Sequence, residues 1–97
     1  MTKADLIAKI SEDTGMERNE VSRAVESMMG FIKSSLTNGQ NVYLRGFGSF
    51  VVRERKQKTG RNISKNTTII IPAHNIPSFK PAKVFVEQVK KIGRAHV

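Results

Sequence analysis

The chain contains no cysteine, few aromatic residues (6%) and no long apolar run. Because cysteine is missing, neither a disulfide framework nor a thiolate metal site can form. The first ten residues, MTKADLIAKI, lack the apolar stretch of a signal peptide, and no run approaches the length of a membrane span. We therefore expect a cytoplasmic protein that has no membrane partner.

Residues suited to catalysis are also scarce. The two histidines are His74 and His96, and a general base needs a positioned partner that the sequence does not offer. No GxGxxG or Walker-type phosphate loop occurs, and no metal-ligand spacing is visible. We expect no enzymatic activity, no metal, no cofactor and no small-molecule substrate. His74 is expected to be structural or to face phosphate.

Positive charge, in contrast, is abundant and unevenly placed. Seventeen Lys and Arg residues stand against eight Asp and Glu residues, which gives a net charge of +9 over 97 residues. Residues 1–40 hold five basic and six acidic side chains, whereas residues 41–97 hold twelve basic and two acidic ones. A basic half joined to a near-neutral half predicts a polyanion-binding surface on a structural base. The plainer alternative is a basic surface that serves only solubility.

The near-neutral half predicts a helical hairpin. Thr2 and Asp5 have the spacing of a capping box, and Gly15 suits the end of the first helix. A second helix is expected between about residues 17 and 39. Its broad apolar stripe follows helical spacing through Val21, Val25, Met28, Ile32 and Leu36. This stripe is wider than the first helix alone can cover, so we predict that the rest of it forms a subunit interface. The alternative is that the sheet covers the rest.

The basic half predicts strands and a final helix. We expect strands at residues 41–44 and 49–52, a returning strand at 67–71 and an extended segment at 74–79 that Pro77 interrupts. Pro81 suits the first turn of the last helix, which has Val84, Phe85 and Val89 on its apolar face.

Between the strands lies a basic segment with a single acid, Glu54, and a single sizeable apolar residue, Ile63. Its basic residues are Arg53, Arg55, Lys56, Lys58, Arg61 and Lys65. With residues 67–71 it predicts a long hairpin whose tip lies near residues 63–66, mostly unpaired when free and ordered when bound. Because strand side chains alternate, Arg53 and Arg55 share a face that could follow phosphates. The bland alternative is a disordered basic loop without a role.

Several short motifs resemble the HU/IHF family of bacterial DNA-bending proteins over about residues 1–90. The motifs are Gly46-Phe47-Gly48-Ser49-Phe50, Arg53-Glu54-Arg55, Gly60-Arg61-Asn62 and Ile76-Pro77-Ser78-Phe79-Lys80-Pro81-Ala82-Lys83. The resemblance implies one α+β domain with an N-terminal helical hairpin, a three-stranded antiparallel sheet, a long β-ribbon arm at about 53–71 and a short C-terminal helix. It also implies an intertwined dimer, as a homodimer or with a paralogous subunit.

The function that the resemblance implies is architectural. Two arms would embrace double-stranded DNA in the minor groove, bending and compacting it with low sequence specificity in the nucleoid. The implied DNA contacts are Lys3, Arg45, Gly46, Gly48, Ser49, Arg53, Arg55, Lys56, Lys58, Arg61, Asn62, Ile63, Lys65, Lys80 and Lys83. The implied dimer core is Val25, Met28, Ile32, Phe47, Phe50 and Phe79, although simple core packing would also explain the three phenylalanines.

One position departs from the family pattern. Family members usually have proline directly after the Gly-Arg-Asn triplet, where this chain has Ile63. Isoleucine can also wedge between base pairs, so we expect bending to persist. A site-preferring, IHF-like subunit remains open, as do an RNA-binding protein and a protein–protein interaction module.

The last seven residues, 91–97, are expected to be a non-native tail. The triplets AAG ATC GGA AGA GCA CAC GTC can encode them, and apart from its first base this string is a common sequencing adapter. The next in-frame triplet of the adapter is a stop.

Overall fold

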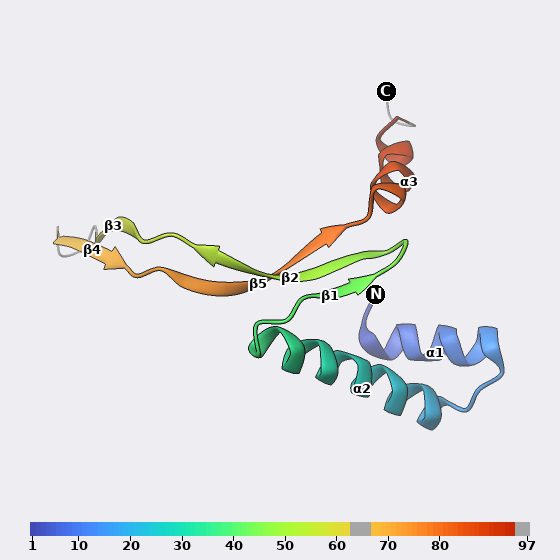
Figure 1. Cartoon of the computed structure of the whole chain (residues 1–97). Coiled ribbons are helices and arrows are strands. Elements are labelled where there is room, and N and C mark those ends of the chain that lie inside the picture. The colour runs from blue at the N-terminus through green and yellow to red at the C-terminus, as the bar shows by residue number, and fades with distance from the viewer. Residues whose placement is uncertain (63–66, 95–97) are drawn as a thin grey trace. The chain divides into compact units, whose positions relative to one another are not determined.

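The computed structural model describes residues 1–62 and 67–94, which form two compact units, Met1–Ser35 and Leu36–Val97. The elements follow in the order α1 (Lys3–Thr14), α2 (Arg18–Thr37), β1 (Val42–Leu44), β2 (Gly48–Arg55), β3 (Lys58–Asn62), β4 (Thr67–Ile71), β5 (His74–Pro81) and α3 (Lys83–Arg94) (Figure 1). Among the described residues, no helix is long and apolar enough to cross a membrane.

The first unit is the predicted helical hairpin, in which α1 and α2 run in opposite directions (Figure 1). The Thr2 hydroxyl accepts a hydrogen bond from the Asp5 amide and the Asp5 carboxylate accepts one from the Thr2 amide, so the predicted capping box is confirmed. Gly15 ends α1 at a φ of 78°, in the left-handed region that glycine tolerates. An ion pair between Lys3 and Glu26 joins the two helices.

The second unit contains a three-stranded antiparallel sheet in the order β1-β2-β5. Two expectations about proline were wrong here. Pro77 does not interrupt the last strand, because β5 is an edge strand and a residue without an N–H is tolerated there. Pro81 is the last residue of β5, opposite Gly48, rather than part of the helix, and α3 begins at Lys83.

The glycines between β1 and β2 serve two different purposes. The turn closes with a hydrogen bond from the Phe47 amide to the Leu44 carbonyl, and Gly46 has a φ of 80° as a type II turn requires at its third position. Gly48 is buried where β5 crosses it. A Cβ at Gly48 would lie 2.6 Å from the Lys80 carbonyl oxygen and 2.6 Å from the Phe79 ring. The first glycine therefore permits the turn, and the second permits close packing.

The described parts of the predicted arm form an antiparallel ribbon made of two ladders (Figure 1). The pairing advances by one residue on each limb from Gly48 opposite Pro81 to Arg55 opposite His74. It resumes in the same register with Lys58 opposite Ile71 and reaches Asn62 opposite Thr67. The ladder is interrupted beside Pro72, which has no N–H to donate.

The structure differs from the expectation of a mostly unpaired arm. The described parts of both limbs are hydrogen-bonded to each other, because β-branched Thr and Ile residues in β4 favour pairing with β3. The predicted tip, residues 63–66, lies outside the described residues.

A single chain buries little apolar surface. Among the described hydrophobic residues only Val21 is buried, with 2% of its surface exposed. Phe31 and Met28 on α2 are 74% and 50% exposed. A domain of this size gains most of its stability from such burial, so one chain by itself has an incomplete core.

We predict that Gly48→Ala destabilises the protein by about 1–3 kcal/mol, because the added methyl group overpacks the contact between β2 and β5. Urea unfolding at fixed protein concentration measures the change. Gly60→Ala is the matched control, since its Cβ would meet its nearest neighbours at 3.9 Å and 4.0 Å. Equal stability of the two variants would contradict the packing role of Gly48.

Candidate nucleic-acid interface

The two faces of the sheet differ in chemistry, because residues that pair across strands lie on the same face. One face carries the pairs Ser49–Lys80, Val51–Ser78, Arg53–Ile76 and Arg55–His74. The other face carries Phe50–Phe79 and Val52–Pro77, with Val42 of β1 opposite Phe50. We call the first the basic face and the second the apolar face.

The basic face of the sheet is hollowed. A concave surface of about 1170 Å³ lies along the sheet and the turn between β1 and β2. Its lining combines polar and apolar residues, with two cationic side chains on the sheet, Arg53 and Lys80, and a third, Arg45, in the turn. The other lining residues are Asn41, Tyr43, Leu44, Gly46, Gly48, Ser49, Val51, Val52, Ser78, Pro81 and Ala82. A broad, positively lined hollow suits a large polyanion better than a small ligand.

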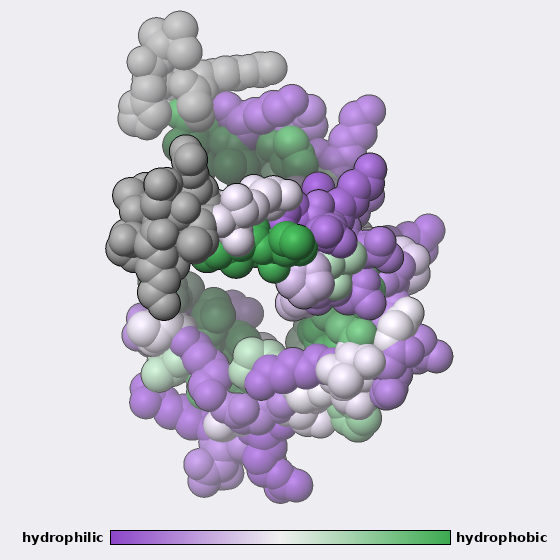
Figure 2. All heavy atoms as spheres, turned by 90° about the vertical axis from the view of Figure 1, so that its left-hand side faces the viewer, coloured by the Kyte–Doolittle hydropathy of each residue, from purple (hydrophilic) through white to green (hydrophobic). Residues whose placement is uncertain are grey.

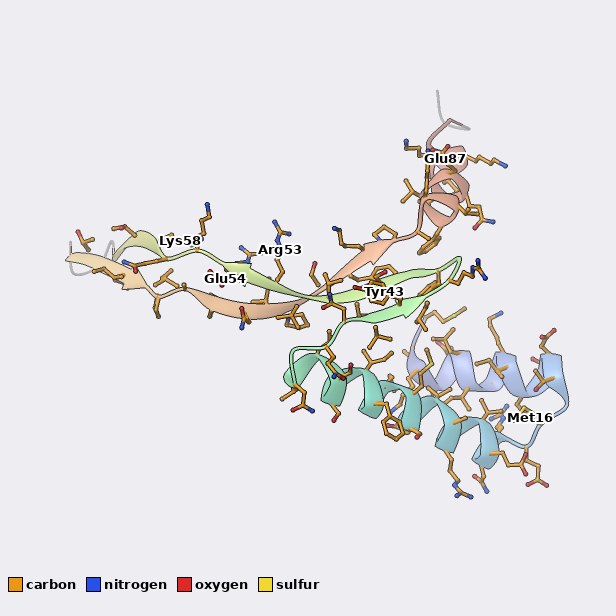
Figure 3. The ribbon with its side chains drawn as sticks, viewed as in Figure 1. Met16, Tyr43, Arg53, Glu54, Lys58 and Glu87 are labelled. Atoms are coloured by element: carbon orange, nitrogen blue, oxygen red, sulfur yellow. The ribbon has the colours of Figure 1, made fainter. Side chains whose placement is uncertain are left out.

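The cations of the arm base lack internal partners. Arg53, Arg55, Lys56 and Lys58 are all exposed. Within the part of the chain that the structure describes, no acidic side chain forms an ion pair with any of them. Glu54 lies on the opposite face from Arg53 and Arg55, opposite Asn75. The side chains of Arg53 and Lys58 extend from the same side of the ribbon (Figure 3), although their positions differ in parity, because strands twist.

The other limb of the arm has a different character. Strand β4, TTIII, contains no charged residue. Ile69, Ile70 and Ile71 are 44%, 64% and 36% exposed. Figure 2 shows exposed hydrophobic side chains, coloured green, on the face that it draws. The arm therefore combines a cationic limb with an apolar one.

The start of α3 adds positive potential next to the turn. The Ala82 amide donates to the Phe47 carbonyl, which ties the end of β5 to the turn between β1 and β2. Lys83 is exposed at the first position of α3, and the first turn holds no acidic residue. The N-terminus of α3 is the positive end of the helix dipole, and the charge of Lys83 is unfavourable there in the free protein. A bound anion would compensate both positive charges.

The structure brings together most of the predicted contacts that it describes. Arg45, Gly46, Ser49, Arg53, Arg55, Lys56, Lys58, Lys80 and Lys83 all belong to the second unit. Arg61 and Asn62 end β3, opposite Thr68 and Thr67. Gly48 is buried, so we assign it to packing. Lys3 belongs to the first unit and pairs with Glu26, and Ile63 and Lys65 lie outside the described residues.

The predicted dimer core is only partly buried in one chain. Phe79 contacts Phe47 and Phe50, with ring centroids 5.1 Å and 5.0 Å apart, yet Phe47 and Phe79 are 45% and 37% exposed. The sequence reasoning missed Phe85 of α3 as a member of this cluster, 5.6 Å from Phe47. Its place on the apolar face of the last helix was the available signal. On α2, Val25 and Ile32 are half-buried and Met28 is exposed.

The sequence predicted that His74 is structural or faces phosphate, but it did not show which residues of β5 share the basic face. Ile76, Ser78 and His74 lie opposite Arg53, Val51 and Arg55. Alternation along β5 was visible in the sequence, but the register that aligns it with β2 was not.

We predict that Arg55→Ala lowers the slope of log K against log salt concentration by about 0.9 for each phosphate that the variant no longer neutralises. A salt series of duplex-binding titrations measures the slope. Arg23→Ala is the control, because it removes an exposed arginine from the near-neutral helical half. An equal decrease of the slope in both variants would mean that net charge alone matters.

Comparison with known proteins agrees with this geometry. The sequence model of the family described as "Bacterial DNA-binding protein" matches residues 1–90. The chain is 40% identical over 91 residues to DNA-binding protein HU of Thermus thermophilus, covering 94% of each chain. It is 42% identical over 90 residues to DNA-binding protein HU 2 of Bacillus phage SPbeta, covering 93% of this chain and 98% of the relative.

Solved structures agree as well. The HU chain of an Anabaena HU–DNA cocrystal structure superimposes with a TM-score of 0.87 at 34% identity, covering 92% of this chain and 97% of that one. The fold, the exposed basic arm and the match over nearly the whole chain lead to one conclusion. This protein belongs to the HU family of bacterial DNA-binding proteins.

Proposed function

We propose that this protein is a dimeric architectural factor that bends and compacts duplex DNA by placing its arms in the minor groove, with low sequence specificity. One observation carries the proposal. The exposed cations Arg53, Arg55, Lys56 and Lys58, which have no acidic partner among the described residues, lie on the limb that continues from the hollowed basic face of the sheet. In this proposal a duplex lies on the basic face and curves to follow the arms, so that both sets of charges are neutralised.

Most of the affinity comes from phosphate neutralisation in this proposal. Arg53, Arg55 and Lys58 contact phosphates along the arm, while Lys80 and Lys83 contact them near the sheet. Such contacts release counterions and do not read base sequence, which is why we propose low specificity. Arg61 and Asn62, next to the tip, reach the floor of the groove.

The dimer follows from the apolar surface that one chain leaves open. The exposed part of the Phe47–Phe79 cluster continues into an apolar groove of about 340 Å³ between β5 and α3. This groove is lined by Phe79, Pro81, Phe85, Val86, Val89 and Lys90. Met28 and Phe31 offer further apolar surface on α2. A second subunit covers these surfaces, and either an identical copy or a paralogue would do so.

The domain boundaries in this proposal are those expected from the sequence. Residues 1–90 form the DNA-binding domain, and residues 91–97 are a non-native tail, although α3 extends to Arg94. The protein acts at the nucleoid and performs no catalysis. At the arm tip, Ile63 is the apolar residue that inserts between two base pairs and unstacks them, as the family's proline would.

The proposed function is tested by gel-shift titrations of linear, nicked and pre-bent duplexes across a salt series. We expect nicked and pre-bent duplexes to bind more tightly, because they lower the cost of bending, and all three affinities to fall steeply with salt. Equal affinity for the three duplexes would remove bending. Stronger competition by RNA would favour an RNA-binding function, and binding that survives high salt would favour a protein partner.

We predict that Ile63→Ala reduces the bend more than it reduces affinity, because the variant lacks the wedge but keeps the phosphate-binding cations. The bend is measured by FRET between the ends of a labelled duplex at saturating protein. Ile70→Ala is the control, since it removes the most exposed isoleucine of β4. An unchanged bend in the Ile63 variant would contradict the wedge.

A further inference from the structure

We propose that His74 is a phosphate-binding residue at the base of the arm, and that it binds phosphate only in its protonated form. DNA binding would then be coupled to proton uptake. This inference rests on the proposed function, because it needs DNA to supply the phosphate.

The position of His74 places it in the basic face. It is the first residue of β5 and pairs with Arg55 of β2, next to the pair Arg53–Ile76. Cross-strand partners share a face, so the imidazole lies on the same face as Arg55 and Arg53. His74 is exposed. A phosphate held by Arg55 is therefore within reach of a neighbour on the opposite strand.

The hydrogen bond of His74 determines which ring nitrogen can bind phosphate. The Nδ1 atom lies 3.0 Å from the Pro72 carbonyl oxygen. A carbonyl oxygen only accepts hydrogen bonds, so Nδ1 carries the proton and donates. In a neutral imidazole the Nε2 atom is then an acceptor, and it cannot bind phosphate, which also only accepts. Protonation converts Nε2 into a charged donor, the form that phosphate binds strongly.

The surroundings of His74 link this protonation to the ligand. Arg55 and Arg53 face it from β2, Lys80 shares its face farther along β5, Lys58 is the nearest described cation of β3, and β4 is uncharged. Glu54 lies on the other face. A charged imidazole therefore meets only positive neighbours in the free protein, and a bound phosphate compensates for them. Because coupling is reciprocal, a phosphate that favours the proton is itself bound more tightly when the proton is present.

Salt-series titrations of a nicked duplex at pH 5.5 and pH 8 test the proposal, because histidine ordinarily changes charge between pH 5 and 8. We expect the slope of log K against log salt concentration to be steeper at pH 5.5 by about 0.9 per subunit. Affinity at fixed salt should rise on the order of tenfold per subunit, as for a hydrogen bond to a charged group. Calorimetry in buffers of different ionisation enthalpy should detect proton uptake when the duplex binds.

Three variants isolate His74. In His74→Asn the slope should be shallow at both pH values, and in His74→Arg it should be steep at both. His96→Asn should behave as the unmodified protein, because it removes the other histidine. A slope that does not change with pH in the unmodified protein, or a change that persists in His74→Asn, would overturn the inference. Steep, pH-independent binding would leave the proposed function intact, whereas absence of duplex binding at both pH values would contradict the proposed function itself.

Discussion

One antiparallel register, shared by both limbs of the arm, decides how the functional surface is arranged. It runs from Gly48 opposite Pro81 to Asn62 opposite Thr67 without a shift. Because side chains alternate along each strand, a shift of one residue would move every side chain to the other face. The phenylalanines would then lie among the cations, and Arg53 and Arg55 would lie on the apolar side of the sheet. The buried contact at Gly48 fixes this register at its start, where the Phe79 ring leaves no space for a side chain.

The register also concentrates positive charge without neutralising it. The ion pairs Lys3–Glu26 and Lys90–Glu87 lie in the helices, whereas Arg53, Arg55, Lys56 and Lys58 have no acidic partner among the described residues. Exposed like charges repel one another and are screened by salt, so they add nothing to the stability of the free chain. They stabilise a complex with a polyanion, because they release the counterions condensed on it. The arrangement therefore stabilises the complex with a polyanion and does not stabilise the free chain.

Local signals in the sequence predicted much of this structure. The capping box at Thr2, the stop at Gly15 and the apolar stripe on α2 are local patterns, and the helices follow them. The hairpin was also predicted, since β-branched residues flank a basic segment. The errors at Pro77 and Pro81 arose because a proline is tolerated in an edge strand. Which strand lies at the edge depends on the strand order, and local sequence does not reveal that order. The same limit hid the pairing of His74 with Arg55 and the packing of Phe85 on Phe47. The subunit interface depends on a second chain, which no local pattern describes.

In the proposed function, the arms occupy the minor groove of a bent duplex. Hydroxyl-radical footprinting of a duplex with a single nick tests it most directly, because these radicals cleave deoxyribose that is accessible from the minor groove, and the nick fixes the position of the protein. We predict two protected segments, one on each side of the nick, that are strongest where the minor groove faces the arms. If a complex shifts in a gel but leaves the minor groove fully accessible on both sides, the arms do not occupy that groove.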